Sequence, residues 1–341
     1  MARKAVLLLN LGSPDSTSVQ DVRRYLKEFL LDERVIDSGP ILRNLLVRGI
    51  ILPTRPKRTA AAYSKVWTNK GSPLIVTSEQ VQKKVQEQIN LPIELAMRYG
   101  SLSIPDAISR LKAQEIEELY IMPMYPHYAM SSYETVLVRV QEELKIQVPS
   151  ITWTVLQPFY KDEDYISALV ESSRPYITED LDKVLFSFHG IPERHMVKAD
   201  SSHAHCMNTP DCCNVCHPAH STCYRHQCFE TVKAMTHKLG LPMGKQAISF
   251  QSRLTKEPWL RPFTDHVLEA FPKEGVKRIA VICPSFVTDC LETLEEIEME
   301  GRKEFLAAGG ELFTMIPCLN EHPAWISMLV NRIRDWDESG Q

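Results

Sequence analysis

Residues 185–190 have the sequence Leu-Phe-Ser-Phe-His-Gly, and residues 7–12 have the sequence Leu-Leu-Leu-Asn-Leu-Gly. Each is a short apolar run that ends at a glycine, which is typical of a buried strand followed by a tight turn. A second pair repeats in the same way, because residues 126–135 and 284–293 both begin with proline and end with Glu-Thr. We interpret the two pairs as one structural unit that occurs twice in the chain.

Short apolar runs alternate with amphipathic stretches along the whole chain. We expect strands at 5–9, 94–98, 118–122, 152–156, 183–188, 247–250, 278–282 and 312–316. We expect helices at 19–31, 78–88, 104–113, 133–144, 164–173, 226–239, 263–270, 291–308 and 323–336. Strands separated by helices form parallel sheets, so the predicted fold class is α/β, with two similar Rossmann-like domains that each contain a parallel sheet flanked by helices.

The composition is that of an ordinary globular protein. The chain has 341 residues, a net charge of −4 and 44% hydrophobic residues, and this length favours two domains. We place them at residues 1–160 and 161–341, with an inserted cysteine-rich loop at about 203–225. No basic cluster indicates nucleic-acid binding, and no secretory signal or run of about 20 apolar residues is present. We therefore expect a cytoplasmic protein with reduced thiols.

One apolar segment has two interpretations. Residues 41–53 are mostly apolar but include Arg43 and Arg48. The first interpretation is a buried helix. The second is an exposed apolar lip that contacts a hydrophobic ligand or a membrane surface. The sequence leaves both open.

His189 and Glu292 lie where the sequence predicts the ends of strands. Ligands of open parallel sheets bind beyond the carboxyl ends of the strands, so we expect a cleft lined by Gly12, His127, His189 and Glu292. An imidazole in such a place accepts a proton or binds a metal ion, and a hydrogen-bonded turn histidine is the structural alternative. No phosphate-binding glycine loop or nucleophile elbow is present in the sequence.

Acidic and aromatic residues near these strand ends also have two interpretations. Glu292, Glu296 and Glu300 are four residues apart, so a helix places them on one face. That face is either simply solvated or, from Glu292 inward, a path for a hard divalent cation between oxygen ligands. Trp259, in a proline-bounded loop, either anchors that loop or forms an aromatic wall for a large flat ligand.

Six of the nine cysteines lie between residues 206 and 228. Clustered cysteines in a reducing compartment favour a metal site, and four thiolates on a loop can surround one centre. The candidate ligands are Cys206, Cys212, Cys213, Cys216 and Cys223. Zinc and an iron–sulfur cluster both suit such ligands, and five nearby histidines keep a mixed zinc site open. We expect the thiols of Cys228, Cys283 and Cys318 to be buried.

Six stretches of the chain, in order, resemble the ferrochelatase family. They are LLLNLGSPDS (7–16), VWTNKGSPL (66–74), PMYPHYAMSS (123–132), LFSFHGIPERH (185–195), FQSRLTKEPWLRPFTD (250–265) and CPSFVTDCLETLEEIEME (283–300). The likeness extends over nearly the whole chain and is strongest to the bacterial protoporphyrin type. It implies a lyase that inserts Fe²⁺ into protoporphyrin IX in the last step of haem biosynthesis. A coproporphyrin ferrochelatase, a cobalt or sirohydrochlorin chelatase, and a non-enzymatic haem or metal sensor are the alternatives.

The resemblance also assigns roles to residues. It implies that His189 and Glu292 are catalytic and contact the metal ion, and that the porphyrin is bound by Leu11, Tyr128, Ser131, Trp259 and Glu296. Cys290 stands where animal members often have histidine, so a general role for a histidine there does not carry over. Some bacterial members hold a [2Fe-2S] cluster on an internal loop, which implies such a cluster on four of the five candidate cysteines.

The partners follow from the same resemblance. We expect a porphyrin and Fe²⁺ as substrates, no nucleic acid, peripheral membrane contact through residues 41–52, and a monomer or homodimer.

Overall fold

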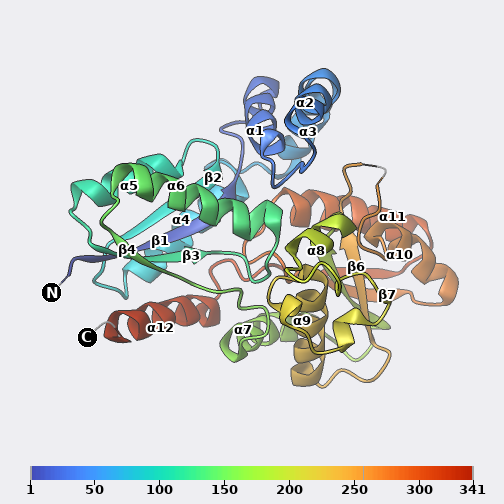
Figure 1. Ribbon diagram of the computed structural model, residues 1–341. Coiled ribbons are helices and arrows are strands. Elements are labelled where there is room, and N and C mark those ends of the chain that lie inside the picture. The colour runs from blue at the N-terminus through green and yellow to red at the C-terminus, as the bar shows by residue number, and fades with distance from the viewer. Residues whose placement is uncertain (1, 256, 340–341) are drawn as a thin grey trace. The chain divides into compact units, whose positions relative to one another are not determined.

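A computed structural model describes residues 2–255 and 257–339 (Figure 1). The chain divides into two compact units, each of which contains one parallel four-stranded sheet. The first unit comprises the chain up to Tyr125, residues 130–157 and the chain from Ile326 onward. The second comprises residues 126–129 and 158–325.

The first unit is built on strands β1 (Lys4–Gly12), β2 (Ile93–Tyr99), β3 (Glu118–Pro123) and β4 (Thr152–Val155), in the order β2-β1-β3-β4. Its helices include α1 (Val19–Leu31), α4 (Pro73–Gln86), α5 (Ile104–Ala113) and α6 (Thr135–Gln147). Figure 1 shows α5 and α6 on one side of this sheet and α12 (Pro323–Ser339) on the other. The central strand is buried from Ala5 to Leu9, as a continuous apolar run in a parallel sheet requires.

The second unit repeats this plan. Its strands are β5 (Lys183–His189), β6 (Gln246–Gln251), β7 (Arg278–Ile282) and β8 (Leu312–Met315), in the order β6-β5-β7-β8. Its helices are α7 (Glu163–Ser173), α8 (Glu193–Ala199), α9 (Tyr224–Leu239), α10 (Thr264–Ala270) and α11 (Arg302–Ala307). The order second-first-third-fourth is the same in both units, and all eight expected strands are present. The predicted fold class and the internal repeat are therefore confirmed.

Gly12 and Gly190 have the same structural role in the two repeats. A Cβ on Gly12, at φ +106°, would lie 1.9 Å from the main-chain oxygen of Tyr99 on β2. A Cβ on Gly190 would lie 2.8 Å from the main-chain oxygen of Gln251 on β6. Both distances are far below van der Waals contact, so in each unit only glycine lets the chain after the central strand pass close to its neighbour.

The last helix belongs to the first unit from Ile326 onward. There the Trp336 ring stacks on Tyr120 with the ring centroids 5.1 Å apart. The Lys4 ammonium also lies 3.0 Å from a carboxylate oxygen of Asp337. This arrangement differs from the sequence-based division at residue 160, which assigned the helix to the second half.

The apolar segment after α1 forms α2 (Pro40–Asn44), a π-helix η1 (Leu45–Ile51) and α3 (Leu52–Val66), none of which we predicted as separate elements. Val47, Ile51 and Leu52 are buried. The opposite face is exposed and consists of Ile41, Leu42, Leu45 and Ile50, of which Ile41 is 86% exposed. The segment is thus helical, but full burial is the wrong interpretation for half of its apolar residues. Among the described helices, none has the length and apolar character needed to span a membrane.

Each unit contains a π-helical segment near the Glu-Thr end of the repeat: η2 (Met130–Glu134) ends at Glu134, and η7 (Glu292–Gly301) begins at the equivalent Glu292. Their hydrogen bonds run from residue i to i+5, and such turns are frequent at functional sites. The helix expected at 291–308 is therefore π-helical over Glu292–Gly301 and continues as the α-helix α11 (Arg302–Ala307).

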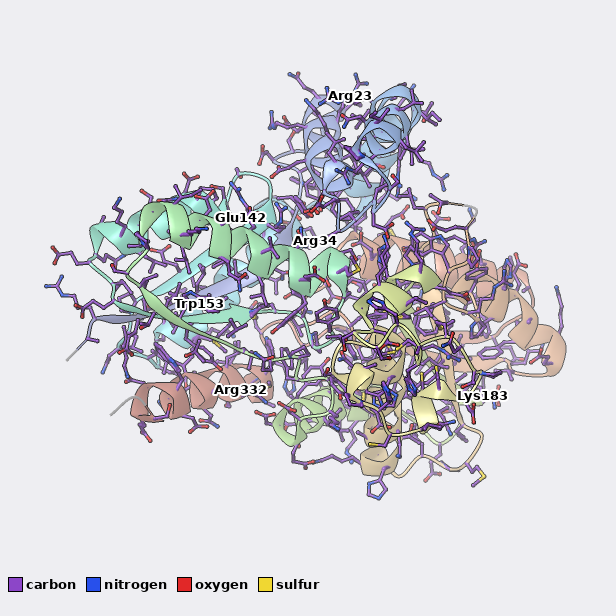
Figure 2. All side chains as sticks on the ribbon, in the orientation of Figure 1. Arg23, Arg34, Glu142, Trp153, Lys183 and Arg332 are labelled. Atoms are coloured by element: carbon purple, nitrogen blue, oxygen red, sulfur yellow. The ribbon has the colours of Figure 1, made fainter. Side chains whose placement is uncertain are left out.

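A buried carboxylate fastens the end of α1 in the first unit. Asp32 accepts hydrogen bonds from Thr135 Oγ1 at 2.5 Å, from the Tyr99 hydroxyl at 3.0 Å and from the main-chain N–H of Arg34 at 2.8 Å, and it pairs with Arg98. Arg34, whose main-chain N–H binds Asp32, lies beside α6 in Figure 2. Burial raises the pKa of Asp32, but these hydrogen bonds and the Arg98 charge outweigh it and hold the pKa below its ordinary value.

Candidate active site

His189 is the last residue of β5, and its ring is partly exposed. Nδ1 lies 2.6 Å from the main-chain oxygen of Gly190. Because a carbonyl oxygen can only accept a hydrogen bond, Nδ1 carries the proton and Nε2 keeps the free lone pair. The backbone is held by Ser285 Oγ, which accepts from the His189 N–H at 3.3 Å, and by the Tyr224 hydroxyl, which donates to the His189 oxygen at 3.0 Å. The strand end therefore presents one ring nitrogen that can accept a proton or bind a metal ion.

Glu296 is an acidic residue whose carboxyl group interacts with the charge of His189. Burial raises the pKa of Glu296, the Ser252 hydrogen bond and the His189 charge lower it in part, and the charge of Glu292 raises it again. The net result is a pKa above the ordinary value. Ser252 Oγ donates to Glu296 Oε2 at 2.5 Å and fixes the carboxyl group. A raised pKa makes a carboxyl group a better proton acceptor than an ordinary glutamate.

Glu292 is held through its main chain. Gln251 Nε2 donates to the Glu292 carbonyl oxygen at 3.0 Å, and Gln251 Oε1 accepts from Ser187 Oγ at 2.8 Å. The ends of β5 and β6 thus fix the start of η7. Burial raises the pKa of the neighbouring Cys290 thiol, and the charge of Glu292 raises it further. A protonated thiol therefore lies beside Glu292.

The sequence did not single out Gln251 and Ser252 as site residues. Both belong to the FQSRLTKEPWLRPFTD stretch, and that membership was the one signal available. Ser252 has a positive φ of 61°, which is uncommon for a residue other than glycine and marks a constrained turn. Gln251 is almost fully buried, so its amide is fixed by the two hydrogen bonds that join β5 to η7.

The residues expected to contact a porphyrin lie in different surroundings. Trp259 is 8% exposed, and its indole N–H donates to Thr255 Oγ1 at 3.2 Å, so the ring also anchors its own loop. Tyr128 belongs to the second unit and is partly exposed. Leu11 and Ser131 are partly exposed residues of the first unit.

His127 does not line a cleft as expected. Its ring is buried within the second unit, where Nε2 lies 2.8 Å from Thr231 Oγ1 and the ring contacts Phe188 and Tyr224 edge-on. Burial lowers the pKa of His127 to about 3. A histidine that stays neutral in the core packs against β5, so its role in the structure is in the core of the second unit.

The cysteine-rich loop contains four buried thiols and one exposed thiol. Cys206, Cys212, Cys213 and Cys223 are buried, whereas Cys216 is exposed. Asp200 organises the beginning of the loop, because its Oδ2 accepts from the main-chain N–H of Cys206 at 2.9 Å. Cys228, Cys283 and Cys318 are buried in the core, as predicted.

The buried thiols also interact with one another. A hydrogen bond from Cys213, supported by one from Cys206, lowers the pKa of Cys223 to about 6, although burial opposes this shift. The pKa of Cys213 is raised, first by its hydrogen bond to Cys223 and then by burial, and the pKa of Cys206 is raised mainly by burial. Arg225 Nη1 lies 3.8 Å from the sulfur of Cys212. Cys223 is therefore the thiol that deprotonates most readily.

These thiols are not arranged as a finished metal site. Across residues 2–255 and 257–339, no three His, Cys, Asp or Glu side chains are positioned to hold a metal ion.

Comparison with known proteins decides the family. The ferrochelatase family model matches residues 3–336. A ferrochelatase of Opitutus terrae is 55% identical, with 98% of each chain covered. The chain belongs to the ferrochelatase family. Ferrochelatases of Pseudomonas fluorescens and Azotobacter vinelandii are each 45% identical, covering 96% and 98% of this chain and 97% and 99% of those relatives.

Solved structures support the same fold. SirB from Bacillus subtilis with Fe³⁺ has a TM-score of 0.56 at 11% identity, covering 100% of this chain and 98% of that one. The sirohydrochlorin chelatase SirB from Bacillus subtilis subspecies spizizenii in complex with cobalt has a TM-score of 0.55 at 12% identity, with the same coverage. At such low identity the likeness extends to the fold alone.

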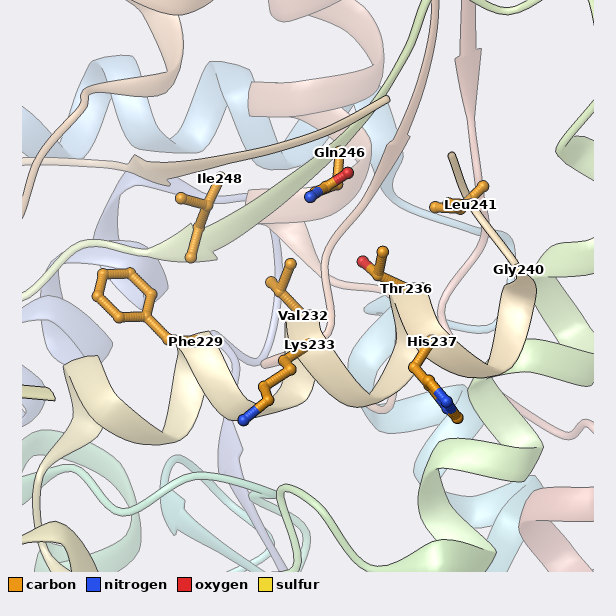
Figure 3. Close-up of a pocket in the computed structure, with 9 residues that line it drawn as sticks. All are labelled: Phe229, Val232, Lys233, Thr236, His237, Gly240, Leu241, Gln246 and Ile248. Carbon is orange, nitrogen blue, oxygen red and sulfur yellow. The ribbon is translucent and has the colours of Figure 1, made fainter. Parts of the chain in front are cut away.

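The second unit also has a surface groove that is separate from the candidate site. It runs along the edge strand β6, and α9 contributes Phe229, Val232 and Thr236 to it (Figure 3). Lys233 and His237 of α9 point away from β6. The groove contains none of the candidate catalytic residues or loop cysteines.

Proposed function

We propose that this ferrochelatase inserts Fe²⁺ into protoporphyrin IX and forms protohaem, the last step of haem biosynthesis. Fe²⁺ is a substrate of this reaction. The observation that carries the proposal is the His189 Nε2 lone pair at the end of β5, together with the charge interaction between His189 and Glu296, a partly buried carboxyl group with a raised pKa, in a chain of this family.

Metal insertion makes three physical demands. The macrocycle has to bend, two pyrrole N–H protons have to leave, and Fe²⁺ has to lose its water ligands. In our proposal His189 Nε2 accepts a pyrrole proton, because Nδ1 is already protonated and held by Gly190. Glu296 then takes the proton from the imidazolium, since its raised pKa favours the protonated carboxyl group, and Nε2 is free again to accept the second pyrrole proton.

Glu292 has the second catalytic role in the proposal, as a carboxylate that contacts the incoming cation. Carboxylate oxygens suit a hard divalent ion, and Glu292 and Glu296 interact electrostatically along η7. The charge of Glu300 acts on Glu304 of α11, so the acidic row continues beyond η7. Leu11, Tyr128, Ser131 and Trp259 remain the residues that we propose to hold the flat ring.

The direct test compares wild-type protein with His189→Ala. We expect the variant to lose insertion of both Fe²⁺ and Zn²⁺ while porphyrin binding, followed by absorbance or fluorescence, is retained. His127→Phe is the matched control, because it removes an imidazole that touches no substrate in this scheme and sits in an aromatic environment. Near-normal turnover of His189→Ala would show that another group accepts the proton.

We further propose that the loop holds a [2Fe-2S] cluster through Cys206, Cys212, Cys213 and Cys223. Burial of these four thiols, the readiness of Cys223 to deprotonate and the exposure of Cys216 support this selection. Such a centre can exchange an electron and hold the loop together, and metal insertion itself needs no electron. We expect Cys213→Ser to lose the iron and acid-labile sulfide of the purified protein and Cys216→Ser to keep both. Zinc in place of iron and sulfide, or an equal loss in both variants, would contradict the assignment.

The exposed apolar face of η1 and its neighbours supports a third proposal, peripheral contact with a membrane. Ile41, Leu42, Leu45 and Ile50 form this face, and Arg43 and Arg48 are interspersed with them. Apolar residues flanked by cationic ones suit the interface of an anionic bilayer. We expect the cytoplasmic protein to sediment with anionic vesicles, and Ile41→Ser with Leu45→Ser to weaken this. Light scattering decides between the monomer and the homodimer.

A further inference from the structure

Three histidines of the cysteine-rich loop and His226 at the start of α9 are stacked in two pairs. The rings of His205 and His217 have centroids 4.0 Å apart and planes 9° apart. The rings of His220 and His226 have centroids 3.6 Å apart and planes 12° apart. The proposed iron–sulfur centre uses none of these imidazoles, so they need a separate explanation.

Two of these rings converge on one main-chain oxygen. His205 Nε2 and His220 Nε2 are 3.3 Å apart, and they lie 2.9 Å and 3.1 Å from the carbonyl oxygen of Cys212. The three atoms therefore form a nearly equilateral triangle of electron-pair donors. Both imidazoles are partly exposed, whereas Cys212 is buried.

Hydrogen bonding does not account for all three contacts. If both Nε2 atoms carry protons, each can donate to the Cys212 oxygen, but two N–H groups then face each other at 3.3 Å. If only one carries a proton, the other Nε2 presents a lone pair to the carbonyl lone pairs. Every placement of protons on His205 and His220 leaves one close contact without a hydrogen bond.

A cation satisfies all three atoms at once. Imidazole nitrogens bind Zn²⁺ at about 2.0–2.1 Å, so two ligands of a tetrahedral ion are about 3.3 Å apart. An ion roughly 2.1 Å from all three atoms lies about 1 Å outside their plane, so the three atoms occupy one face of a tetrahedral shell. Water would complete the shell from the solvent side.

We propose that His205 Nε2, His220 Nε2 and the main-chain oxygen of Cys212 bind a divalent transition-metal ion, of the class that includes Zn²⁺, Co²⁺ and Fe²⁺. Imidazole is a preferred ligand for this class. The site uses two side chains and one carbonyl group, which agrees with the absence of any three-side-chain site in the described ranges. It needs no thiolate and is separate from His189 and Glu292.

The surroundings fix the two ligands. The main-chain N–H of His205 donates to Asp200 Oδ2 at 2.9 Å, which anchors one flank of the loop. His226 stacks on His220, and its Nδ1 lies 2.9 Å from the carbonyl oxygen of Cys213. Since His205 and His220 lie on opposite sides of residues 206–216, one ion ties the two flanks together. The ion therefore clamps the loop independently of the cysteines.

The test measures Zn²⁺ bound to the full-length protein after gel filtration, together with the shift in melting temperature on adding Zn²⁺. We expect His205→Ala and His220→Ala each to lose one equivalent of Zn²⁺ and to bind it about tenfold or more weakly. His217→Ala is the matched control, because it lies in the same loop and stacks on His205 but contributes no atom to the triangle. It should keep the ion, and Cys213→Ser should keep it as well.

Co²⁺ added to wild-type protein gives a second measurement that does not depend on a variant folding. Nitrogen and oxygen ligands give weak visible bands, whereas a bound thiolate adds an intense near-ultraviolet charge-transfer band. Weak bands that disappear in His220→Ala support the site. Equal Zn²⁺ in wild type and both histidine variants, or a thiolate band as the main Co²⁺ signal, overturns it. Iron and sulfide content in the histidine variants reports separately on the proposed cluster.

Discussion

Replacing Gly190 by alanine tests whether the geometry behind His189 matters for catalysis. A Cβ at this position would lie 2.7 Å from the main-chain oxygen of Ser252 and 2.8 Å from that of Gln251, whereas ordinary contact begins at 3.4 Å. The two loops therefore have to separate by about 0.7 Å. The Gly190 N–H donates to the Gln251 carbonyl oxygen at 2.5 Å and joins the chain after β5 to the end of β6. The separation would lengthen this hydrogen bond to about 3.2 Å and weaken it.

The expected magnitudes follow from this displacement. Forcing a methyl group into this tightly packed turn destabilises the fold by about 1–3 kcal/mol. The same shift moves the carbonyl oxygen of residue 190, which holds Nδ1 of His189, and a misplacement approaching 1 Å costs up to about 100-fold in rate. We expect Gly190→Ala to lower kcat/KM for Zn²⁺ insertion into protoporphyrin on the order of 10- to 100-fold, and urea unfolding to give the loss in stability.

Gly240→Ala separates the two effects. Gly240 ends α9 with φ +69°, and a Cβ there meets no atom within 4 Å. The left-handed conformation alone makes the alanine variant about 1–2 kcal/mol less stable, which is close to the loss expected for Gly190→Ala. Its activity at a temperature where it is folded should equal that of wild type. If Gly190→Ala keeps kcat/KM within about twofold of wild type while it is destabilised as expected, the backbone at residue 190 does not position His189.

Two further predictions concern buried carboxyl groups. Asp32→Ala should destabilise the protein by about 3 kcal/mol, because Arg98 loses its partner, whereas the exposed Asp15→Ala should cost less than about 1 kcal/mol. The folded-state pKa of Asp32 is lowered, so ionised Asp32 stabilises the protein above its unfolded-state pKa. This stabilisation is lost as pH falls through the folded-state pKa. The midpoint of urea unfolding should therefore fall more on acidification in wild type than in Asp32→Ala. The folded-state pKa of Glu296 is raised, so its ionisation reduces stability as pH rises from the unfolded pKa through the folded pKa. Glu296→Gln should remove that loss and also reduce turnover, and an unchanged pH–stability profile would contradict the assigned burial.

The strands could be predicted from the sequence because their physics is local. A strand buried on both faces of a parallel sheet needs an apolar run; residues 5–9 are a continuous one, and residues 184–188 are one interrupted only by Ser187. The repeat was visible for the same reason, since Gly12 and Gly190 each allow a close approach that no other residue permits. The apolar face around Ile41 could not be assigned, because composition does not say whether a partner covers it.

The arrangement of the site was less accessible. The spacing of Glu292 and Glu296 predicted a shared helical face, but the switch to i→i+5 hydrogen bonds in η7 has no sequence signature that we recognised. The burial of Glu296 against Ser252 and its interaction with His189 depend on loops that approach each other from distant parts of the sequence. His127 shows the opposite error, because its position after a strand suggested a ligand-binding residue and tertiary packing buries it.

The cysteine-rich loop shows how much the spacing of cysteines in the sequence can predict about a metal site. Five thiols were equivalent candidates in the sequence, and burial separates exposed Cys216 from the other four. The convergence of His205 and His220 on a carbonyl oxygen was not predictable, because it depends on the backbone path between them.

The most direct test of the account is an anaerobic Fe²⁺ insertion assay with purified protein, in which protoporphyrin IX and coproporphyrin are compared side by side and the haem product is measured. We expect wild-type protein to form protohaem over many turnovers, with protoporphyrin IX as the preferred ring. We expect His189→Ala to bind protoporphyrin IX without forming product. Preference for coproporphyrin would contradict the proposed substrate, and tight binding of porphyrin or metal without turnover by wild-type protein would contradict the proposed reaction.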